Sequence, residues 1–289
     1  MRLLTPICLP LIPVLLAIGG CSEKDSAPVA EDTKRRCNGH SALCDRPLNQ
    51  VTLPTTHNAM SNADAGWFAP NQNHNISAQL EDGIRGLMLD THDWEGDAYL
   101  CHTYCELGAQ PLLEGLGEIK AFMSAHPNEV LVIIFQDALS VERMVEALEE
   151  SGLASLAWTY DGTFPTLGEL IDAGTPLVIS AESGAPPPAW YHHAWGLIQD
   201  TPYSFASAEE FSCSEHRGEP SSPLFLVNHW LSTPLPTEEG AAEVNREDIL
   251  LARAEACTEA RGRPINLLGV DFYDHGDLFE VVDILNGVN

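Results

Sequence analysis

The sequence predicts an α/β fold built on one parallel sheet, and two features of the chain predict it. Short apolar runs recur without the alternation of a half-exposed strand, which is typical of strands buried on both faces. Stretches with apolar residues at helical spacing lie between these runs. This order of strand and helix is typical of βα repeats around a parallel sheet. We therefore predict a single irregular (β/α)8, TIM-like barrel.

The strands are predicted from apolar runs along the chain. The five clearest are Arg85–Asp90, Glu129–Phe135, Pro176–Ser180, Leu224–Asn228 and Asn266–Phe272. Weaker runs near Asn49–Pro54, Tyr99–Cys101 and Leu197–Asp200 bring the count close to eight. A doubly wound open sheet is the alternative architecture. The sequence lacks the glycine-rich phosphate loops G-x-G-x-x-G and G-x-x-x-x-G-K-[ST], so the barrel is favoured.

Helices are predicted between these strands. Apolar residues from Val141 to Leu148 follow the spacing i, i+3, i+4, i+7, and those from Leu278 to Leu285 repeat it. A third helix is predicted in the stretch LLEGLGEIKAFMSA, and it should end at His126-Pro127 because proline cannot continue the backbone ladder.

The N-terminal region is predicted to lie outside the barrel. A basic Arg2 precedes an apolar stretch that ends in the sequence IGGC at Cys21. This order resembles a bacterial lipoprotein signal that is cut before Cys21, whose sulfur then carries lipid. A retained membrane helix and an ordinary signal with a free cysteine are the alternatives. We predict a signal peptide over residues 1–20, a flexible tether over 21–36 and the barrel over 37–289.

The charge of the chain excludes some classes of partner. There are 14 Lys and Arg residues against 42 Asp and Glu residues, a formal charge of −28. The basic residues form no cluster beyond Lys34-Arg35-Arg36. Nucleic-acid binding needs a cationic face, so the composition argues against it. It argues equally against electrostatic adhesion to anionic lipid.

Six cysteines remain after the two in the signal and at the lipidation site are set aside. They are Cys37, Cys44, Cys101, Cys105, Cys213 and Cys257. An even number in an exported protein favours disulfides, and pairing along the chain is the simplest of the 15 sets: 37–44, 101–105 and 213–257. A zinc site in LCHTYC is the rival reading, although its spacing is unusual for zinc ligands.

Polar or titratable side chains follow six of the predicted strands. They are His57-Asn58, Asp90, His102, Gln136-Asp137, Asn228-His229 and Asp271. One such residue is usually a satisfied structural group. Six are harder to explain in this way, because catalytic groups of a barrel gather where its strands end.

Two histidines from different strands suit in-line attack on a phosphodiester. One imidazole accepts a proton from the nucleophile while the other gives a proton to the leaving oxygen. His57 and His102 meet this requirement. The carboxylate of Asp271 follows the last strand, which neighbours the first strand in a closed barrel. It is therefore placed to orient His57.

An ordered set of motifs resembles the X domain of phosphatidylinositol-specific phospholipase C, in its plant, fungal and bacterial X-domain branch. The motifs are THNAM, NQNHNISAQLEDGIRGLMLDTHDWEGDAYLCHTYC, HPNEVLVIIFQD, FPTLGELIDAGTPLVI, VNHWL and LGVDFY, from Asn49 to Asn289. The resemblance implies a TIM-like barrel in which His57 and His102 are the catalytic histidines. It implies that Asp271 is the carboxylate beside His57.

The resemblance also implies a choice between arginine and calcium for stabilising the phosphoryl charge. Asn58 matches the calcium-dependent relatives, and Asp90 fits a ligand position. Met88 departs from the expected acid, and the next acid position holds Gln136 with Asp137 beside it. Arg85 lies on the opposite strand face from Asp90. With no arginine well placed, we predict Ca²⁺ bound by Asn58, Asp90 and Asp137. This set of ligands is incomplete, and the alternative is an enzyme without a cofactor.

The remaining predictions concern substrate and location. Gln136, His229 and Trp230 are assigned to substrate binding, and the aromatic stretch at residues 190–195 to packing or to a lid. We predict a monomeric, exported, lipid-anchored phosphodiesterase that cleaves a phosphoinositide-like headgroup. A glycerophosphodiester or sphingomyelin-type phosphodiesterase is one alternative. An inactive lipid-anchored binding protein is the other.

Overall fold

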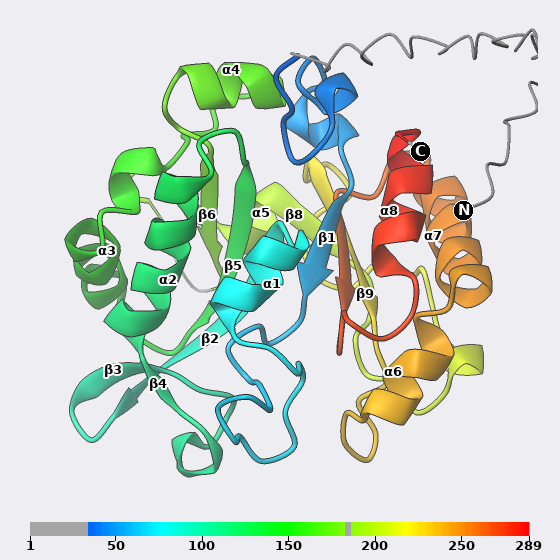
Figure 1. Cartoon of the computed structure of the whole chain (residues 1–289), viewed down its shortest axis with the longest axis horizontal. Coiled ribbons are helices and arrows are strands. Elements are labelled where there is room, and N and C mark those ends of the chain that lie inside the picture. The colour runs from blue at the N-terminus through cyan, green and yellow to red at the C-terminus, as the bar shows by residue number, and fades with distance from the viewer. Residues whose placement is uncertain (1–33, 183–185, 289) are drawn as a thin grey trace, which may run out of the picture. The chain divides into compact units, whose positions relative to one another are not determined.

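The strands and helices alternate along the chain as the sequence predicts. The structure is a computed structural model that describes residues 34–182 and 186–288 (Figure 1). The predicted signal peptide, the lipidation site Cys21 and most of the tether lie outside the described residues. Within the described ranges, no helix has the length and apolar character needed to span a membrane.

Ten strands form a single sheet in the described residues. Their bounds are β1 Leu53–Thr56, β2 Gly86–Trp94, β3 Asp97–Leu100, β4 Gln110–Pro111, β5 Leu131–Asp137, β6 Leu177–Ala181, β7 Tyr191–His193, β8 Ile198–Asp200, β9 Leu224–His229 and β10 Leu267–Val270. Eight of them are parallel neighbours in the order β7-β6-β5-β2-β1-β10-β9-β8. No ladder among the described strands joins β7 to β8, so the curled sheet is an incompletely closed barrel. The predicted irregular barrel is confirmed.

Eight α-helices accompany the sheet in the described residues. They are α1 Ile76–Asp82, α2 Leu112–Ala125, α3 Val141–Glu150, α4 Leu167–Asp172, α5 Ala194–Leu197, α6 Glu238–Val244, α7 Glu247–Arg261 and α8 Leu278–Asn286. The three helices predicted from spacing correspond to α2, α3 and α8. As expected, α2 ends with His126 at its C-cap, one residue before the proline.

Two of the weaker strand predictions need correction. The run near Tyr99 forms β3, which pairs antiparallel with β2 and β4 and is not one of the parallel strands of the barrel. The barrel strand that the sequence missed is β7, in the aromatic stretch assigned to packing or to a lid. The first strand also begins later than predicted, at Leu53, because Leu48–Gln50 forms a 3-10 turn.

Alternate residues of the strands pack into two hydrophobic clusters. In β5, Leu131, Ile133 and Phe135 belong to the cluster that includes buried residues of α2 and α3. Val132 and Ile134 belong to a second cluster with inward residues of other strands. Side chains of a strand point alternately to opposite faces, so each barrel strand is buried on both sides. This explains the continuous apolar runs in the sequence.

Strand register places the inner face of the sheet at the site described below. Met88 of β2 lies opposite Ile134 of β5, and Asp90 lies opposite Gln136. The carboxyl ends of the parallel strands point toward the lower edge of Figure 1, where the loop after β1 and the β3–β4 excursion gather.

Candidate active site

A cavity of about 470 Å³ opens at the carboxyl ends of the barrel strands. Its volume is within the range of small-molecule sites. Predicted residues that line it are His57, Asn58, Asp90, His102, Gln136, Trp230 and Asp271. The described structure therefore brings together seven strand-end residues that are as much as 214 positions apart in the chain.

His57 is held by a buried carboxylate. Its Nδ1 lies 2.8 Å from Asp271 Oδ1, and the backbone N–H of His57 donates to Val270 O of β10. The closure between the first and last strands thus brings Asp271 to His57, as predicted from barrel topology. Burial raises the pKa of Asp271, and the neighbouring His57 opposes that rise. Because Nδ1 faces the carboxylate, Nε2 is the ring nitrogen left for a substrate.

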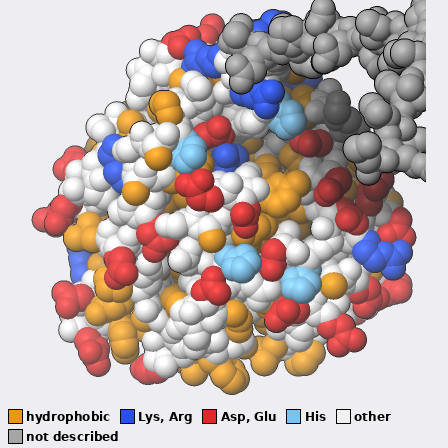
Figure 2. Space-filling view, in the orientation of Figure 1, with side chains coloured by type: hydrophobic (Ala, Val, Ile, Leu, Met, Phe, Trp, Pro, Cys, Tyr) orange, Lys and Arg blue, Asp and Glu red, His pale blue; other side chains and the backbone are white. Residues whose placement is uncertain are grey.

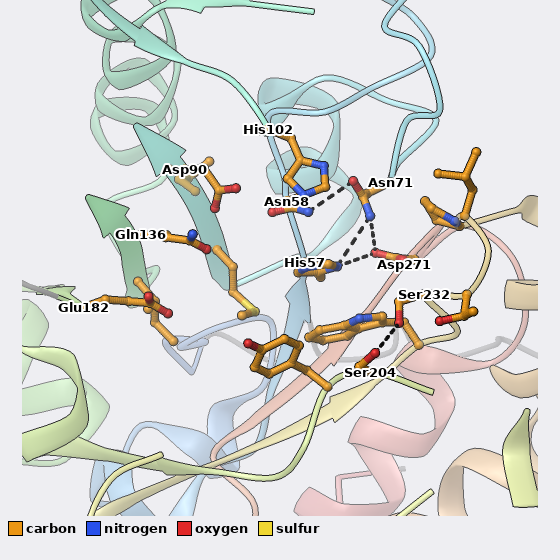
Figure 3. Close-up of a pocket in the computed structure, with 18 of the residues that line it drawn as sticks. His57, Asn58, Asn71, Asp90, His102, Gln136, Glu182, Ser204, Ser232 and Asp271 are labelled. Carbon is orange, nitrogen blue, oxygen red and sulfur yellow. Dashed lines mark hydrogen bonds and ion pairs between the residues drawn. The ribbon is translucent and has the colours of Figure 1, made fainter. Parts of the chain in front are cut away.

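Asn71 was not identified from the sequence, yet its side chain contacts this pair. Its Nδ2 donates to Asp271 Oδ1 at 3.1 Å, and its Oδ1 accepts from Asn58 Nδ2 at 3.2 Å (Figure 3). The side chain therefore links the carboxylate to the amide of Asn58. Asn71 comes from the loop that precedes α1, where no strand-end pattern marks it.

Trp230 forms the surface on which His57 rests. The two rings are stacked, with centroids 3.8 Å apart and planes within 5° of parallel. Trp230 is only 2% exposed, so its position is set by the core of the barrel. Trp230 lines the cavity, as predicted. One face of its indole, however, is stacked against the imidazole of His57.

His102 enters the cavity from the turn after β3. Cys101 and Cys105 on either side are joined by a disulfide, and both cysteines are buried while His102 is exposed. Burial of the ring, together with the nearby His57 and His92, lowers the pKa of His102 to about 4. The imidazole lies on the wall of the open cavity, where neighbouring groups cover part of the ring while the rest meets solvent.

Three backbone strains coincide with the three proposed catalytic residues. Asn58, Thr103 and Phe272 have φ values of 47°, 63° and 45°, and they directly follow His57, His102 and Asp271. Residues with side chains adopt this left-handed region rarely. Such conformations cluster at functional sites, where surrounding structure enforces them. Here they turn the chain sharply after each strand-end residue.

Acidic and amide side chains occupy the other side of the cavity. Figure 3 shows Asp90, Gln136 and Glu182 across the pocket from Asn71 and Asp271. Burial raises the pKa of Asp90 to about 7, with His57 opposing and Glu182 adding to the rise. Glu182 follows β6 and was missed, because the apolar run Pro176–Ser180 ends two residues before it.

Two predicted site residues face away from the cavity, and both assignments are corrected. Asp137 does not line it, and Tyr191 Oη donates to Asp137 Oδ2 at 3.3 Å. His229 is fully buried, with Nε2 2.8 Å from Val244 O. Each is the neighbour of a residue that does line the cavity, Gln136 or Trp230, and successive side chains of a strand point to opposite faces.

An arginine that the sequence did not place also reaches the cavity. Of the Lys and Arg residues in the described part of the chain, only Arg217 lines it. Its guanidinium donates to Asp200 Oδ2 through Nε and Nη2 and to Glu182 Oε1 at 2.5 Å through Nη1. It also lies over the rings of Trp195 and Tyr203. Arg217 belongs to the β8–β9 connection, whose path no apolar pattern reveals.

The donor set of the cavity fits a hard cation only in part. Asn58, Asp90, Gln136 and Glu182 offer the amide and carboxylate oxygens that calcium prefers. Glu182 is already engaged by Arg217. Within the described residues, no group of three His, Cys, Asp or Glu side chains is arranged to hold a metal. A Ca²⁺ ion held here would therefore need most of its six to eight oxygen ligands from water or substrate.

Comparison with known proteins gives a consistent result. A family model described as PI-PLC X matches residues 43–286. The chain is 28% identical over 270 residues to a PI-PLC X domain-containing protein of Arabidopsis thaliana, covering 83% of this chain. It is 27% identical over 284 residues to PI-PLC X domain-containing protein 1 of Arthroderma benhamiae, covering 90% of this chain. The chain spans 63% of the plant relative's length and 92% of the fungal relative's length.

Solved structures show a similar fold. The phosphatidylinositol-specific phospholipase C of Staphylococcus aureus superposes with a TM-score of 0.59. The match covers 85% of this chain and 95% of the bacterial enzyme, at 15% sequence identity. At this identity the likeness establishes the arrangement of the barrel.

Proposed function

The chain belongs to the PI-PLC X domain family, and on this premise we propose that it is a phosphodiesterase that cleaves a phosphoinositide-like phospholipid. One observation carries the proposal: His57, paired with buried Asp271, lines the same cavity as His102. The two imidazoles follow different strands, β1 and β3, so they can act from opposite sides of a bound phosphodiester, as acid–base assistance to in-line displacement requires.

The proposed first step forms one P–O bond and breaks another. A headgroup hydroxyl oxygen attacks phosphorus, and its proton passes to Nε2 of His57. Asp271 stabilises the imidazolium that results. The P–O bond to the leaving alcohol breaks, and that oxygen receives a proton from His102. With phosphatidylinositol the products are diacylglycerol and a cyclic inositol phosphate. In a second step water opens the cyclic ester, with the two histidines exchanging roles.

The protonation of His102 depends on the substrate in this proposal. Burial and the two neighbouring histidines lower the pKa of His102 to about 4. An anionic phosphodiester beside the ring favours its charged form and so raises that pKa. Proton donation is thereby linked to occupation of the cavity.

Two sources of positive charge are proposed for the phosphoryl oxygens. Arg217 is held by Asp200 and Glu182, which also attenuate its charge. We propose Ca²⁺ as the second, held by Asn58 and Asp90. When bound, the ion would stabilise negative charge that develops on phosphoryl oxygens. Asp137 is not included, because its side chain contacts Tyr191 on the other face of β5.

Export and lipid anchoring form a separate part of the proposal. The described residues contain three disulfides, which are typical of oxidising compartments. A relative from Arthroderma benhamiae, 28% identical over 290 residues, is named an uncharacterized secreted protein. We propose that the chain is exported and attached to the cell-envelope membrane through Cys21, and that it acts as a monomer. Globomycin-sensitive processing and palmitate labelling that is lost in Cys21→Ala test the anchor.

Phosphorus NMR of the purified protein with phosphatidylinositol tests the activity. Appearance of a cyclic phosphodiester signal is the expected result, and His57→Ala and His102→Ala should each abolish it. The same spectra with glycerophosphoinositol and sphingomyelin separate the alternative substrates. If the wild-type protein leaves phosphatidylinositol intact with and without Ca²⁺, the proposal is wrong.

A further inference from the structure

An apolar groove adjoins the active-site cavity at His102. Its volume is about 250 Å³. Its apolar walls are Trp67, Phe68, Tyr104, Leu107, Leu235 and Pro236. Resting on the function proposed above, we propose that this leaving-group groove binds a segment of the hydrocarbon chain of the leaving alcohol. The site would then select lipid phosphodiesters over water-soluble ones.

The groove is a built feature of three loops. The Phe68 backbone N–H donates to Leu107 O at 2.8 Å, which joins the loop after β1 to the turn after His102. Trp67 packs so tightly over Gly108 that a Cβ there would lie 2.3 Å from the indole. The disulfide between Cys101 and Cys105 closes the same turn. The walls formed by residues 67–68 and 104–108 are therefore held by backbone and covalent links.

The groove also concentrates exposed apolar surface. Phe68, Tyr104, Leu107 and Leu235 are 66%, 64%, 46% and 52% exposed, and they include most of the large exposed hydrophobic side chains of the described residues. In Figure 2 hydrophobic side chains gather along the lower margin, where Figure 1 places the loops after β1 and around β3 and β4. Such a patch on a protein this acidic favours an apolar ligand.

The position of the groove selects the leaving alcohol as its occupant. His102, Leu235 and Pro236 line both the groove and the active-site cavity. The groove therefore meets the cavity at the histidine that protonates the leaving oxygen. Within residues 34–182 and 186–288, its lining includes no Asp, Glu, Lys or Arg side chain. A charged headgroup therefore finds no Asp, Glu, Lys or Arg partner there, whereas a hydrocarbon chain loses no hydrogen bonds on entry.

Short-chain phosphatidylinositols below their critical micelle concentrations test the groove without a lipid surface. Each methylene that enters should raise kcat/KM about fourfold, so the dihexanoyl substrate should exceed the dibutanoyl substrate by about tenfold or more. The double variant Phe68→Gln/Leu107→Gln should flatten this dependence, so that its kcat/KM values for the dihexanoyl and dibutanoyl substrates agree within about threefold. Leu113→Gln is the matched control, because Leu113 is 43% exposed and lies outside the groove.

The outcomes separate failure of the groove from failure of the proposed function. Turnover that does not depend on chain length, or whose dependence persists in the double variant, overturns the groove alone. Dependence that appears only above the critical micelle concentration assigns the patch to a lipid surface and also overturns it. If no substrate is cleaved, calorimetric binding of butyl and octyl phosphate decides. The wild type and Leu113→Gln should each bind octyl phosphate at least tenfold more tightly than butyl phosphate, and the double variant should not show this difference. Equal binding of the two phosphates by the wild type overturns the proposal.

Discussion

Replacement of Asp271 by Asn should abolish most of the activity while leaving the fold intact. The change removes one charge from a side chain that is 3% exposed and lies 2.8 Å from His57 Nδ1. Asn Oδ1 can still accept from His57 and from Asn71. The other carboxylate oxygen, Asp271 Oδ2, has no hydrogen-bond partner in the described structure, so an amide nitrogen placed there loses no bond.

The size of the effect follows from the charge that His57 acquires during the reaction. Two unit charges about 4 Å apart at an effective dielectric constant near 20 interact by about 4 kcal/mol. A barrier raised by this amount slows the reaction about 10³-fold, which agrees with the 10²–10⁴-fold range typical of acid–base assistance. Most of the loss should be in kcat, because the carboxylate stabilises an imidazolium that forms only as the reaction proceeds.

Initial rates with a soluble short-chain phosphatidylinositol measure the effect, and thermal unfolding by circular dichroism checks the fold. Asp274→Asn is the control, since it makes the same substitution three residues later at an exposed position. It should retain the wild-type rate. A folded Asp271→Asn protein with kcat within threefold of the wild type would show that the carboxylate does not support His57 in the reaction.

Three further predictions test stability and metal dependence. Cys213→Ser/Cys257→Ser opens a link across 44 residues and should lower the free energy of unfolding in urea by about 4 kcal/mol; an unchanged midpoint would contradict this. Burial and nearby Arg253 lower the pKa of His229 to about 3. Between about pH 3 and 6.5 the unfolded state therefore binds more protons than the folded state, and the free energy of unfolding falls as the pH drops through that window. His229→Gln should reduce this slope by up to about 1.4 kcal/mol per pH unit, and equal slopes in urea titrations would refute it. EGTA should lower activity and Ca²⁺ restore it, with Asp90→Asn raising the Ca²⁺ needed for half-activity because a charged ligand is lost; full activity of both proteins in EGTA would exclude the ion.

Residues at strand ends were predicted because their placement depends on topology alone. In parallel strands the carboxyl ends meet at one edge, so His57, Asp90 and Asp271 are brought together whatever the details of packing. Parity within one strand was equally readable, and it correctly separated Arg85 from Asp90. Arg85 donates to Glu129 at 2.7 Å, away from the cavity.

The inward or outward direction of adjacent strand-end residues was decided only by the tertiary structure. All four residues of the adjacent pairs Gln136-Asp137 and His229-Trp230 were assigned to the site, but only Gln136 and Trp230 line the cavity. Strands buried on both faces are apolar at every position, so their sequences do not reveal which alternate set faces inward. That phase is set by register with neighbouring strands, as in the pairing of Asp90 with Gln136.

The sequence by itself determined the class of fold, the histidine pair with its carboxylate, and three disulfides between cysteines paired in order along the chain. Only the tertiary structure placed Asn71, Glu182 and Arg217 in the cavity and assembled the groove beside His102. These features belong to connections between strands or lie just beyond a strand end. The path of a connection is set by contacts with segments distant in sequence, such as Arg217 with Asp200 and Glu182, and no local periodicity encodes those contacts.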